Sequence, residues 1–396
     1  MKFFGSGRTK LVAVFDIGSS SVGAALSEIK PGMKPRILQV VRESTDPQEK
    51  LDHRRFFLSM KKAFESVSQK LEGKAGKQVV DEVACFFSSP WYAALHDAAR
   101  IAKHKPFRLT DQLLENAINA RVLDFEEEEK QKYEDEELGA PKLIEKESMH
   151  VSLNGYEVSD YEKKMITEAE VAFFASVVPG RVLDDISEQV SRRFNHRKTG
   201  FHTFPFASYV IIRDMLLHGE HSFLLLDISG EMTDMLWVEN GIVRKSAAFP
   251  LGKNFVLRRI AETLRVSLPE AESLLFMQAS ERAEKNTAVL VEKTLQNCAK
   301  DWLAKLQEEI RRFMRGGISP QKIFFASDEN IAWWFGGMLK KENISGYAAG
   351  RSEKKNPPVC FLGKALAKNF CDFAEGVPKD AFLSVETAFL ERFQNS

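Results

Sequence analysis

Two short stretches of the chain contain the residue types that hold phosphate groups in proteins. The first follows the apolar run 11–15, begins at Asp16 and continues as Ile-Gly-Ser-Ser-Ser to Ser21. Gly18 allows a close backbone approach, successive backbone N–H groups can form an anion-binding nest, and the hydroxyls add donors. The spacing is not that of a Walker loop, which requires Gly, four residues and then Gly-Lys-Ser/Thr. A serine-rich hairpin turn without a ligand is the alternative interpretation.

The second stretch repeats this arrangement in the other half of the chain. Asp227 ends the apolar run 223–226, and Gly230 stands in the turn that leads to Thr233 and Asp234. An acidic, glycine-containing turn that occurs twice indicates an internal duplication of a phosphate-binding hairpin. Chance would produce such a pair far less often than either copy alone.

The elements that must position these turns alternate between strands and helices. Apolar periodicity predicts three strands and then a helix, at 11–17, 22–29, 36–41 and about 50–71. A further helix beginning at Thr110, with strand-like stretches at 148–158 and 167–178, forms a separate small module. We therefore expect an α/β body that carries an inserted subdomain.

Composition excludes several classes of protein. A chain of 396 residues, 44% of them hydrophobic, can fill the cores of two domains or of one two-lobed body. Lys+Arg and Asp+Glu are equal at 56 each, so no global field recruits nucleic acid and we expect no nucleic-acid partner. The four cysteines form no Cys-x-x-Cys pair, which favours a reducing cytoplasm over a zinc site or a disulfide framework. The sequence has neither a signal peptide nor a run of eighteen apolar residues, so we expect no membrane-spanning helix.

The order of the motifs resembles the actin-like ATPase superfamily, in which two duplicated lobes each present an acidic hairpin to a bound nucleotide. Within it, the chain is similar to FtsA, a family of bacterial cell division proteins, over roughly residues 10–370. The matching segments are DIGSSSV at 16–22, LLDISGEMTDMLWVENG at 225–241, AFPLGKNFVLRRIAETLRVSLPEAESLL at 248–275 and FLGKALA at 361–367. PilM, a family of cytoplasmic ring proteins of type IV pilus machines, shares the lobes and a similar first loop and is the alternative.

The resemblance implies a two-lobed actin-like ATPase fold with an FtsA-type inserted small subdomain in the first lobe. The expected parts are the first lobe, the inserted subdomain, the second lobe, its helical subdomain and a C-terminal tail. The first lobe is expected at 1–82 with 177–207, and the inserted subdomain at 83–176. The second lobe is expected at 208–252 with 318–375, its helical subdomain at 253–317 and the tail at 376–396.

The resemblance also implies roles in binding ATP with magnesium. Asp16 would position magnesium and water, and Asp227 would face it from the other lobe as the second catalytic carboxylate. The remaining residues that would hold the nucleotide are Gly18, Ser19, Ser20, Ser21, Gly230, Thr233, Asp234 and, on the ribose side, Glu272.

Several departures from the family pattern weaken the expectation of catalysis. FtsA sequences usually have Lys where this chain has Ser21. Their second loop usually reads Asp-Ile-Gly-Gly-Gly-Thr-Thr-Asp, whereas Ser229 and Glu231 replace two glycines here, and residues 326–328 replace a third, Gly-Gly-Gly loop. If the Glu231 carboxylate pointed at phosphate from about 4 Å, repulsion would be roughly 4 kcal/mol at an effective dielectric constant of 20. We therefore expect at most a weak ATPase, with nucleotide binding that is weak or lost.

Two functions fit these expectations. An FtsA-like scaffold would self-assemble and link the FtsZ filament to the inner face of the cytoplasmic membrane, as a peripheral cytoplasmic protein. A PilM-like adaptor of a type IV pilus or secretion machine would instead bind the peptide tail of a membrane partner.

The FtsA interpretation assigns two surfaces. The acidic C-terminal peptide of FtsZ would meet six arginines, although a solvated helix face explains them equally well: Arg258, Arg259, Arg265, Arg311, Arg312 and Arg315. The tail has an apolar helical face expected to contact the membrane through Phe382, Phe389, Leu390 and Phe393. Few basic residues flank this face, so docking on the protein's own core or on a partner is the alternative.

Overall fold

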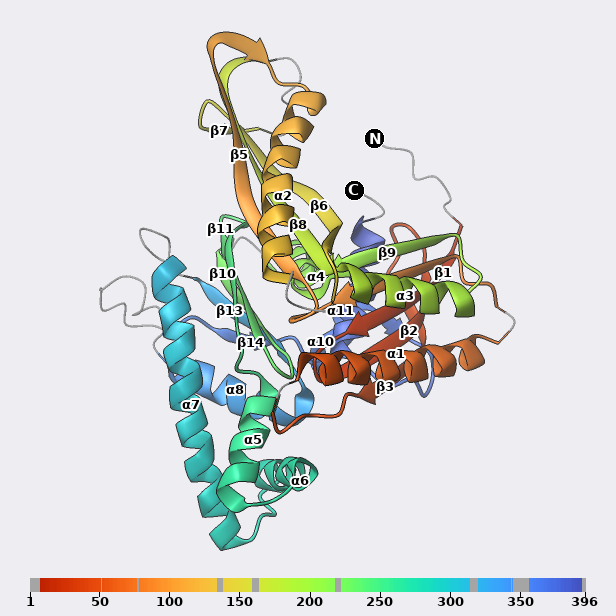
Figure 1. Ribbon diagram of the computed structural model, residues 1–396, viewed down its shortest axis with the longest axis vertical. Coiled ribbons are helices and arrows are strands. Elements are labelled where there is room, and N and C mark those ends of the chain that lie inside the picture. Colours follow the sequence, from red (N-terminus) through yellow and green to blue (C-terminus); the bar gives the residue numbers. More distant parts are fainter. Residues whose placement is uncertain are drawn as a thin grey trace.

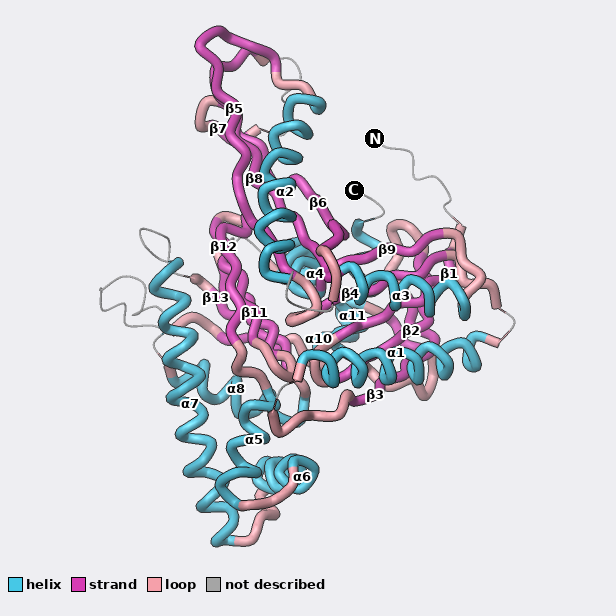
Figure 2. The backbone as a smooth tube through the Cα atoms, viewed as in Figure 1, coloured by secondary structure: helices cyan, strands magenta, loops and turns pink. Residues whose placement is uncertain are grey.

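Three β-sheets organise the chain, one at the centre of each of two lobes and one in an inserted subdomain (Figure 1, Figure 2). The computed structural model describes residues 8–50, 52–76, 78–133, 138–158, 164–217, 222–313, 320–342, 344 and 356–393. This architecture is the two-lobed α/β fold that the sequence predicts.

The first lobe contains a six-stranded sheet in the order β15-β3-β2-β1-β4-β9. Its strands are β1 (Lys10–Ile17), β2 (Ser21–Ile29), β3 (Arg36–Ser44), β4 (Glu82–Phe87), β9 (Lys198–Thr203) and β15 (Asp372–Phe373). The helices α1 (His53–Ala75) and α3 (Gly180–Arg193) cover one face. Side chains alternate along β1, so Phe15 packs under α1 while Val14 points to the opposite face.

The second lobe contains a five-stranded sheet in the order β12-β11-β10-β13-β14. Its strands are β10 (Phe223–Ile228), β11 (Thr233–Glu239), β12 (Ile242–Phe249), β13 (Lys322–Ser327) and β14 (Val359–Phe361). Its helices are α5 (Lys253–Leu264), α6 (Leu268–Ala279), α7 (Lys285–Phe313), α8 (Glu329–Lys341) and α10 (Lys364–Phe370). A capping box between Ser267 and Glu270 starts α6, as the Ser-x-x-Glu pattern favours.

The inserted subdomain projects away from the two lobes (Figure 1). Its antiparallel sheet has the order β5-β8-β6-β7. The strands are β5 (Ala93–Arg108), β6 (Pro141–Leu153), β7 (Tyr156–Glu157) and β8 (Met165–Pro179), and the helix is α2 (Asp111–Tyr133). Leu114 and Ile118 of α2 pack on the sheet. At the base of the subdomain, His96 of β5 bonds to Ser246 of β12, so the subdomain also contacts the second lobe.

One hydrophobic core joins the two lobes. The helix α4 (Phe204–Ile211), which continues into the short π-helix η1 (Ile212–Leu216), packs together with α11 (Ala381–Phe393). The same apolar cluster contains Val14 of β1, Leu225 of β10 and Phe389 of α11. Because this core is continuous, apolar burial holds the lobes together in addition to any polar contact.

The C-terminal segment belongs to the first lobe, which corrects two expectations. The strand β15, expected in the second lobe, pairs with β3. The apolar face of α11, expected to contact lipid, instead covers the first sheet: Phe389 is 0% and Leu390 6% exposed, Phe382 is partly buried, and Phe393 is 37% exposed. The alternative expectation, docking on the protein's own core, is what the structure has. Among the described residues, no helix combines the length and apolar character needed to cross a bilayer.

We expect Phe389→Ala to lower the free energy of unfolding by about 3–5 kcal/mol, because it opens a cavity in the shared core. Denaturant unfolding followed by circular dichroism measures this change. Arg392→Ala, which alters a half-exposed side chain on the same helix, is the control and should stay within about 0.5 kcal/mol. An equally small effect of Phe389→Ala would show that α11 is not docked in solution.

Candidate functional site

The first turn, between β1 and β2, uses its own polar groups internally. The Gly18 N–H donates to the Ser21 carbonyl at 3.1 Å, and Trp91 Nε1 donates to the Gly18 carbonyl at 3.1 Å. The Thr45 hydroxyl donates to the Ser19 carbonyl at 2.9 Å. An anion nest needs free N–H groups, and the N–H of Gly18 is already bonded within the turn.

The second turn, between β10 and β11, lies directly against the first. The hydroxyl oxygens of Ser19 and Ser229 are 2.9 Å apart, and the Glu231 N–H donates to the Ser19 hydroxyl at 2.9 Å. A Cβ on Gly230 would fall 2.7 Å from the Cβ of Ser20, so this glycine permits contact between the turns. The Ser19 hydroxyl, expected to hold phosphate, therefore takes part in a contact between the lobes.

The N-terminus of α5 packs onto the second turn in the same way. Helix N-termini attract anions because their first N–H groups lack helical partners. Here the N–H groups of Lys253 and Asn254 donate to the carbonyls of Ser229 and Gly230, at 3.0 and 2.7 Å. A Cβ on Gly252 would lie 2.4 Å from the Ser229 carbonyl oxygen, so the helix end and the turn leave no room for a phosphate between them.

Glu231 is turned toward α5 and is neutralised there. Its side chain is 3% exposed and accepts hydrogen bonds from Arg258 at 2.7 and 3.1 Å and from the Asn254 amide at 2.8 Å. Arg258 also donates to the Gln48 carbonyl of the first lobe at 3.2 Å. The repulsion considered for a Glu231 carboxylate that faces phosphate therefore does not apply to this arrangement, and Arg258 links the two lobes.

Arg42 of β3 neutralises Asp16. One guanidinium nitrogen lies 2.8 Å from Asp16 and donates to the Ser21 hydroxyl, and the others bind both oxygens of Asp380 at 2.7 and 2.9 Å. Burial raises the pKa of Asp16 to about 6, and Arg42 opposes that rise. Sequence reasoning missed Arg42 and Asp380. The available signal was that a buried carboxylate requires a counter-charge.

Asp227 and Asp234 lie opposite one another on β10 and β11. Asp234 accepts hydrogen bonds from Ser89 at 2.7 Å and Tyr92 at 3.1 Å, and burial raises its pKa to about 6. Asp227 is 1% exposed, its carboxylate oxygens form no hydrogen bond of ordinary geometry within the described part of the chain, and the nearby Ser88 side chain only partly offsets its burial. Burial, and then the charge of Asp234, raises the pKa of Asp227 well above its usual range. The protein interior therefore disfavours the ionised form of Asp227.

The remaining cleft does not fit a magnesium nucleotide. In the described ranges, no group of three or more His, Cys, Asp or Glu side chains is arranged to hold a metal ion. A cavity of about 440 Å³ remains beside the turns, and several of its charged side chains pair inside the protein, among them Arg42 with Asp380. Lys253 binds Glu272 at 2.6 Å and Asp328 at 3.2 Å, so the side chain expected on the ribose side is occupied. Thr233 likewise donates to the Leu251 carbonyl at 2.8 Å.

The arginines expected to bind a partner do not form one free cluster. Arg258 is committed to Glu231, as described above. Arg259 lies 3.6 Å from Asp301, and Arg312 binds Glu308 at 2.7 Å and Glu309 at 2.9 Å. The remaining members, Arg265 and Arg311, lie at the ends of α5 and α7, and Arg315 lies outside the described residues.

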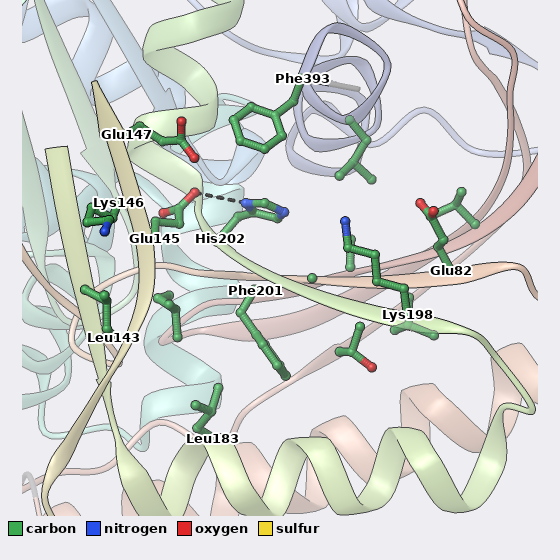
Figure 3. Close-up of a pocket in the computed structure, with 17 residues that line it drawn as sticks. Glu82, Leu143, Glu145, Lys146, Glu147, Leu183, Lys198, Phe201, His202 and Phe393 are labelled. Atoms are coloured by element: carbon green, nitrogen blue, oxygen red, sulfur yellow. Dashed lines mark hydrogen bonds and ion pairs between the residues drawn. The ribbon is translucent and has the colours of Figure 1, made fainter. Parts of the chain in front are cut away.

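A second cavity, of about 330 Å³, lies between the first lobe and the inserted subdomain (Figure 3). We call it the β9–β6 groove, because residues 198–202 of β9 and 143–147 of β6 form its two sides. Leu183 of α3 and Leu390 and Phe393 of α11 add apolar walls. No sequence motif predicts this groove, since its walls come from segments far apart in the chain.

Glu145 fixes one end of the β9–β6 groove. Its buried carboxylate accepts hydrogen bonds from the Thr203 N–H at 2.9 Å, the Thr203 hydroxyl at 3.0 Å and the Ser176 hydroxyl at 3.1 Å. It also lies 3.0 Å from His202 Nδ1, as Figure 3 shows. These bonds join β6 to β9 and β8, so the groove is a preformed part of the fold.

The strands beside the groove have unpaired edges. β9 is the last strand of the first sheet, and β6 pairs with β7 only through Ser152 and Leu153. An edge strand offers N–H and C=O groups with which another extended chain can pair. The groove therefore combines apolar walls with backbone groups suited to a peptide.

We expect calorimetric titration of the protein with magnesium-ATP to show no binding, because the turns that would hold the phosphates contact each other. Hydrolysis should be absent for the same reason. Submicromolar affinity, or turnover that Asp16→Ala abolishes, would contradict this expectation.

We expect Asp227→Asn to stabilise the protein relative to the unmodified chain as the pH rises from 5 to 8. The folded chain must keep a proton on Asp227 that the unfolded chain releases, so stability from this group is present below the unfolded pKa and lost above it. The loss can reach about 1.4 kcal/mol per pH unit, and the asparagine removes it. Denaturant unfolding at each pH measures the difference, with the exposed Asp301→Asn as control. A difference that does not change with pH would show that Asp227 is ionised.

Several solved structures are similar to this chain over nearly its whole length. PilM from a structure described as the PilM-PilN type IV pilus biogenesis complex has a TM-score of 0.61 and 14% sequence identity, covering 96% of this chain and 98% of that chain. The ethanolamine utilization protein EutJ from Carboxydothermus hydrogenoformans gives a TM-score of 0.44 at 9% identity, covering 96% and 89%. A Ppx/GppA family member from Aquifex aeolicus gives a TM-score of 0.34 at 12% sequence identity, covering 98% of this chain and 91% of that chain.

No protein-family model and no curated protein matches the chain. At 14% identity the similarity to PilM shows the fold alone. The protein has the two-lobed actin-like ATPase fold, which confirms the fold predicted from the sequence.

Proposed function

We propose that the chain is a non-enzymatic adaptor of the PilM kind, an actin-fold scaffold that holds a peptide segment of a membrane protein in the β9–β6 groove. The observation that carries this proposal is a contrast between two clefts. The turns that would hold nucleotide contact each other through Ser19 and Ser229, whereas the groove has apolar walls and free strand edges.

The groove favours an extended peptide over a compact ligand. A chain that adds to the edge of β9 gains main-chain hydrogen bonds, which supply affinity without regard to sequence, and the apolar walls select alternate side chains. The similarity to PilM supports a protein partner, because the solved PilM structure is named as a complex with PilN. The adaptor would then work at the inner face of the cytoplasmic membrane through its partner in a pilus or secretion machine.

The FtsA-like alternative has less support from the side chains. Arg258 is needed to neutralise Glu231, and Arg259 and Arg312 already have acidic neighbours. The apolar face of α11, which would anchor an FtsA-like protein to lipid, lies in the core. Self-assembly of the scaffold stays a prediction from the family resemblance.

We expect overlapping synthetic peptides that cover PilN to include at least one that binds the full-length protein, measured by fluorescence anisotropy. Gly200→Leu places a side chain in the groove and should weaken that binding at least tenfold, about 1.4 kcal/mol. Gly73→Leu is the matched control, because the space around Gly73 on α1 is open and lies outside the groove.

A C-terminal FtsZ peptide is the comparator in the same assay and should not bind. Two results together would favour the FtsA-like alternative. The FtsZ peptide would bind and lose that binding on Arg259→Glu, and no PilN peptide would show binding that depends on the groove.

A further inference from the structure

One face of β9 presents two charged or polar side chains with a gap between them. Side chains alternate along a strand, so Lys198, Gly200 and His202 share a face while Phe201 points to the other side (Figure 3). Gly200 has no side chain, and the notch that this leaves in the floor of the groove is bounded by the His202 ring, whose Nε2 would lie 3.1 Å from a Cβ on Gly200. Leu390 and Phe393 of α11 line the same cavity and give the notch an apolar wall.

Most charged side chains of the groove are already paired inside the protein. Lys146 binds Glu115 and the Asn119 side chain, and Glu82 binds Lys10 at 2.8 Å. Glu145 has the hydrogen bonds given above. None of these groups is available to a ligand without breaking a contact.

Lys198 and Glu147 differ from these groups. Within the described ranges, neither side chain forms an ion pair or a hydrogen bond, and Figure 3 shows them on opposite sides of the groove, with Glu147 beside His202 and Phe393. Glu147 is half-buried, and burial followed by the charge of Glu145 raises its pKa. An occupant that brought a cation to Glu147 would relieve this desolvation.

The spacing of these features matches an extended chain. Lys198 and His202 are four residues apart, about 13 Å along a strand, and Glu147 lies at the His202 end. In an extended peptide, residues i, i+2 and i+4 share one face and cover the same length. Three successive side chains on that face would therefore meet Lys198, the notch at Gly200 and Glu147 in turn.

We propose that the β9–β6 groove selects an extended segment with an acidic residue opposite Lys198, an apolar residue over Gly200 and a basic residue opposite Glu147, at alternate positions. This inference rests on the proposed function, because it specifies the peptide that the adaptor holds. The pattern reads acid-x-apolar-x-base or its reverse, according to the direction in which the segment runs along β9.

The test is selection from a random library of phage-displayed peptides on the full-length protein. Peptides enriched on the unmodified protein should share the alternating acid, apolar and base pattern. A double variant, Lys198→Glu with Glu147→Lys, should select the same spacing with the two charges exchanged. Peptides from the first selection should lose at least tenfold in affinity on this variant, and peptides with exchanged charges should recover it.

The matched control exchanges an ion pair on a distant surface. Lys305 and Glu308 of α7 lie 2.8 Å apart and are half-exposed, so Lys305→Glu with Glu308→Lys should leave the selected pattern unchanged. Denaturant unfolding of each variant confirms that the fold is retained.

Different results would contradict the proposed peptide pattern and the proposed adaptor function. Peptides that lose binding on Gly200→Leu but show no charge pattern would overturn the present inference and leave the adaptor function standing. Selected peptides that are all insensitive to Gly200→Leu would overturn both. If the charge pattern of the selected peptides does not reverse on the exchanged variant, Lys198 and Glu147 do not determine which peptides bind.

Discussion

A Cβ on Gly230 would fall 2.7 Å from the Cβ of Ser20, and the rest of the structure depends on this close approach of the two turns. Because the turns touch, the hydroxyls of Ser19 and Ser229 bond each other and the two lobes are in direct contact there. The continuous core around α4 and α11 reinforces the same closed arrangement. The β9–β6 groove, between the first lobe and the inserted subdomain, is lined by other residues than these turns.

Each acidic side chain left in the closed cleft is neutralised in its own way. Arg42 neutralises Asp16, and Arg258 neutralises Glu231. Asp234 is bound by two hydroxyl groups, and burial disfavours the ionised form of Asp227. A buried carboxylate without such compensation is strongly destabilising, so these arrangements are a condition for closing the cleft.

The sequence predicted the fold well because the relevant signals are local. Apolar runs that end in Asp16 and Asp227 mark the two central strands, and their repetition indicates two related lobes. The site was harder to predict because its contacts are long-range: Arg42 looks like an ordinary strand residue until the chain brings Asp380 beside it. The apolar period of α11 is the same for a helix on lipid and a helix on a protein core, so the sequence could not decide where Phe389 lies.

The β9–β6 groove could not be read from any single motif. It forms where the edge of β9, strand β6 of the inserted subdomain and the end of α11 come together. The peptide-binding roles proposed for Lys198 and Glu147 depend on this arrangement, because the two residues are far apart in the sequence. Its proposed function therefore depends on the cleft staying closed, since the fold then acts as a fixed scaffold and not as a nucleotide-driven switch.

The distance between the lobes in solution tests this central claim most directly. Spin labels on Leu58→Cys of α1 and Phe276→Cys of α6, which are 54% and 60% exposed, would report it by pulsed electron paramagnetic resonance, with the half-buried Cys360 changed to Ser. A closed scaffold predicts one narrow distance distribution that is identical without nucleotide, with magnesium-ADP and with magnesium-ATP. A second population, or a distribution that shifts when nucleotide is added, would contradict the account.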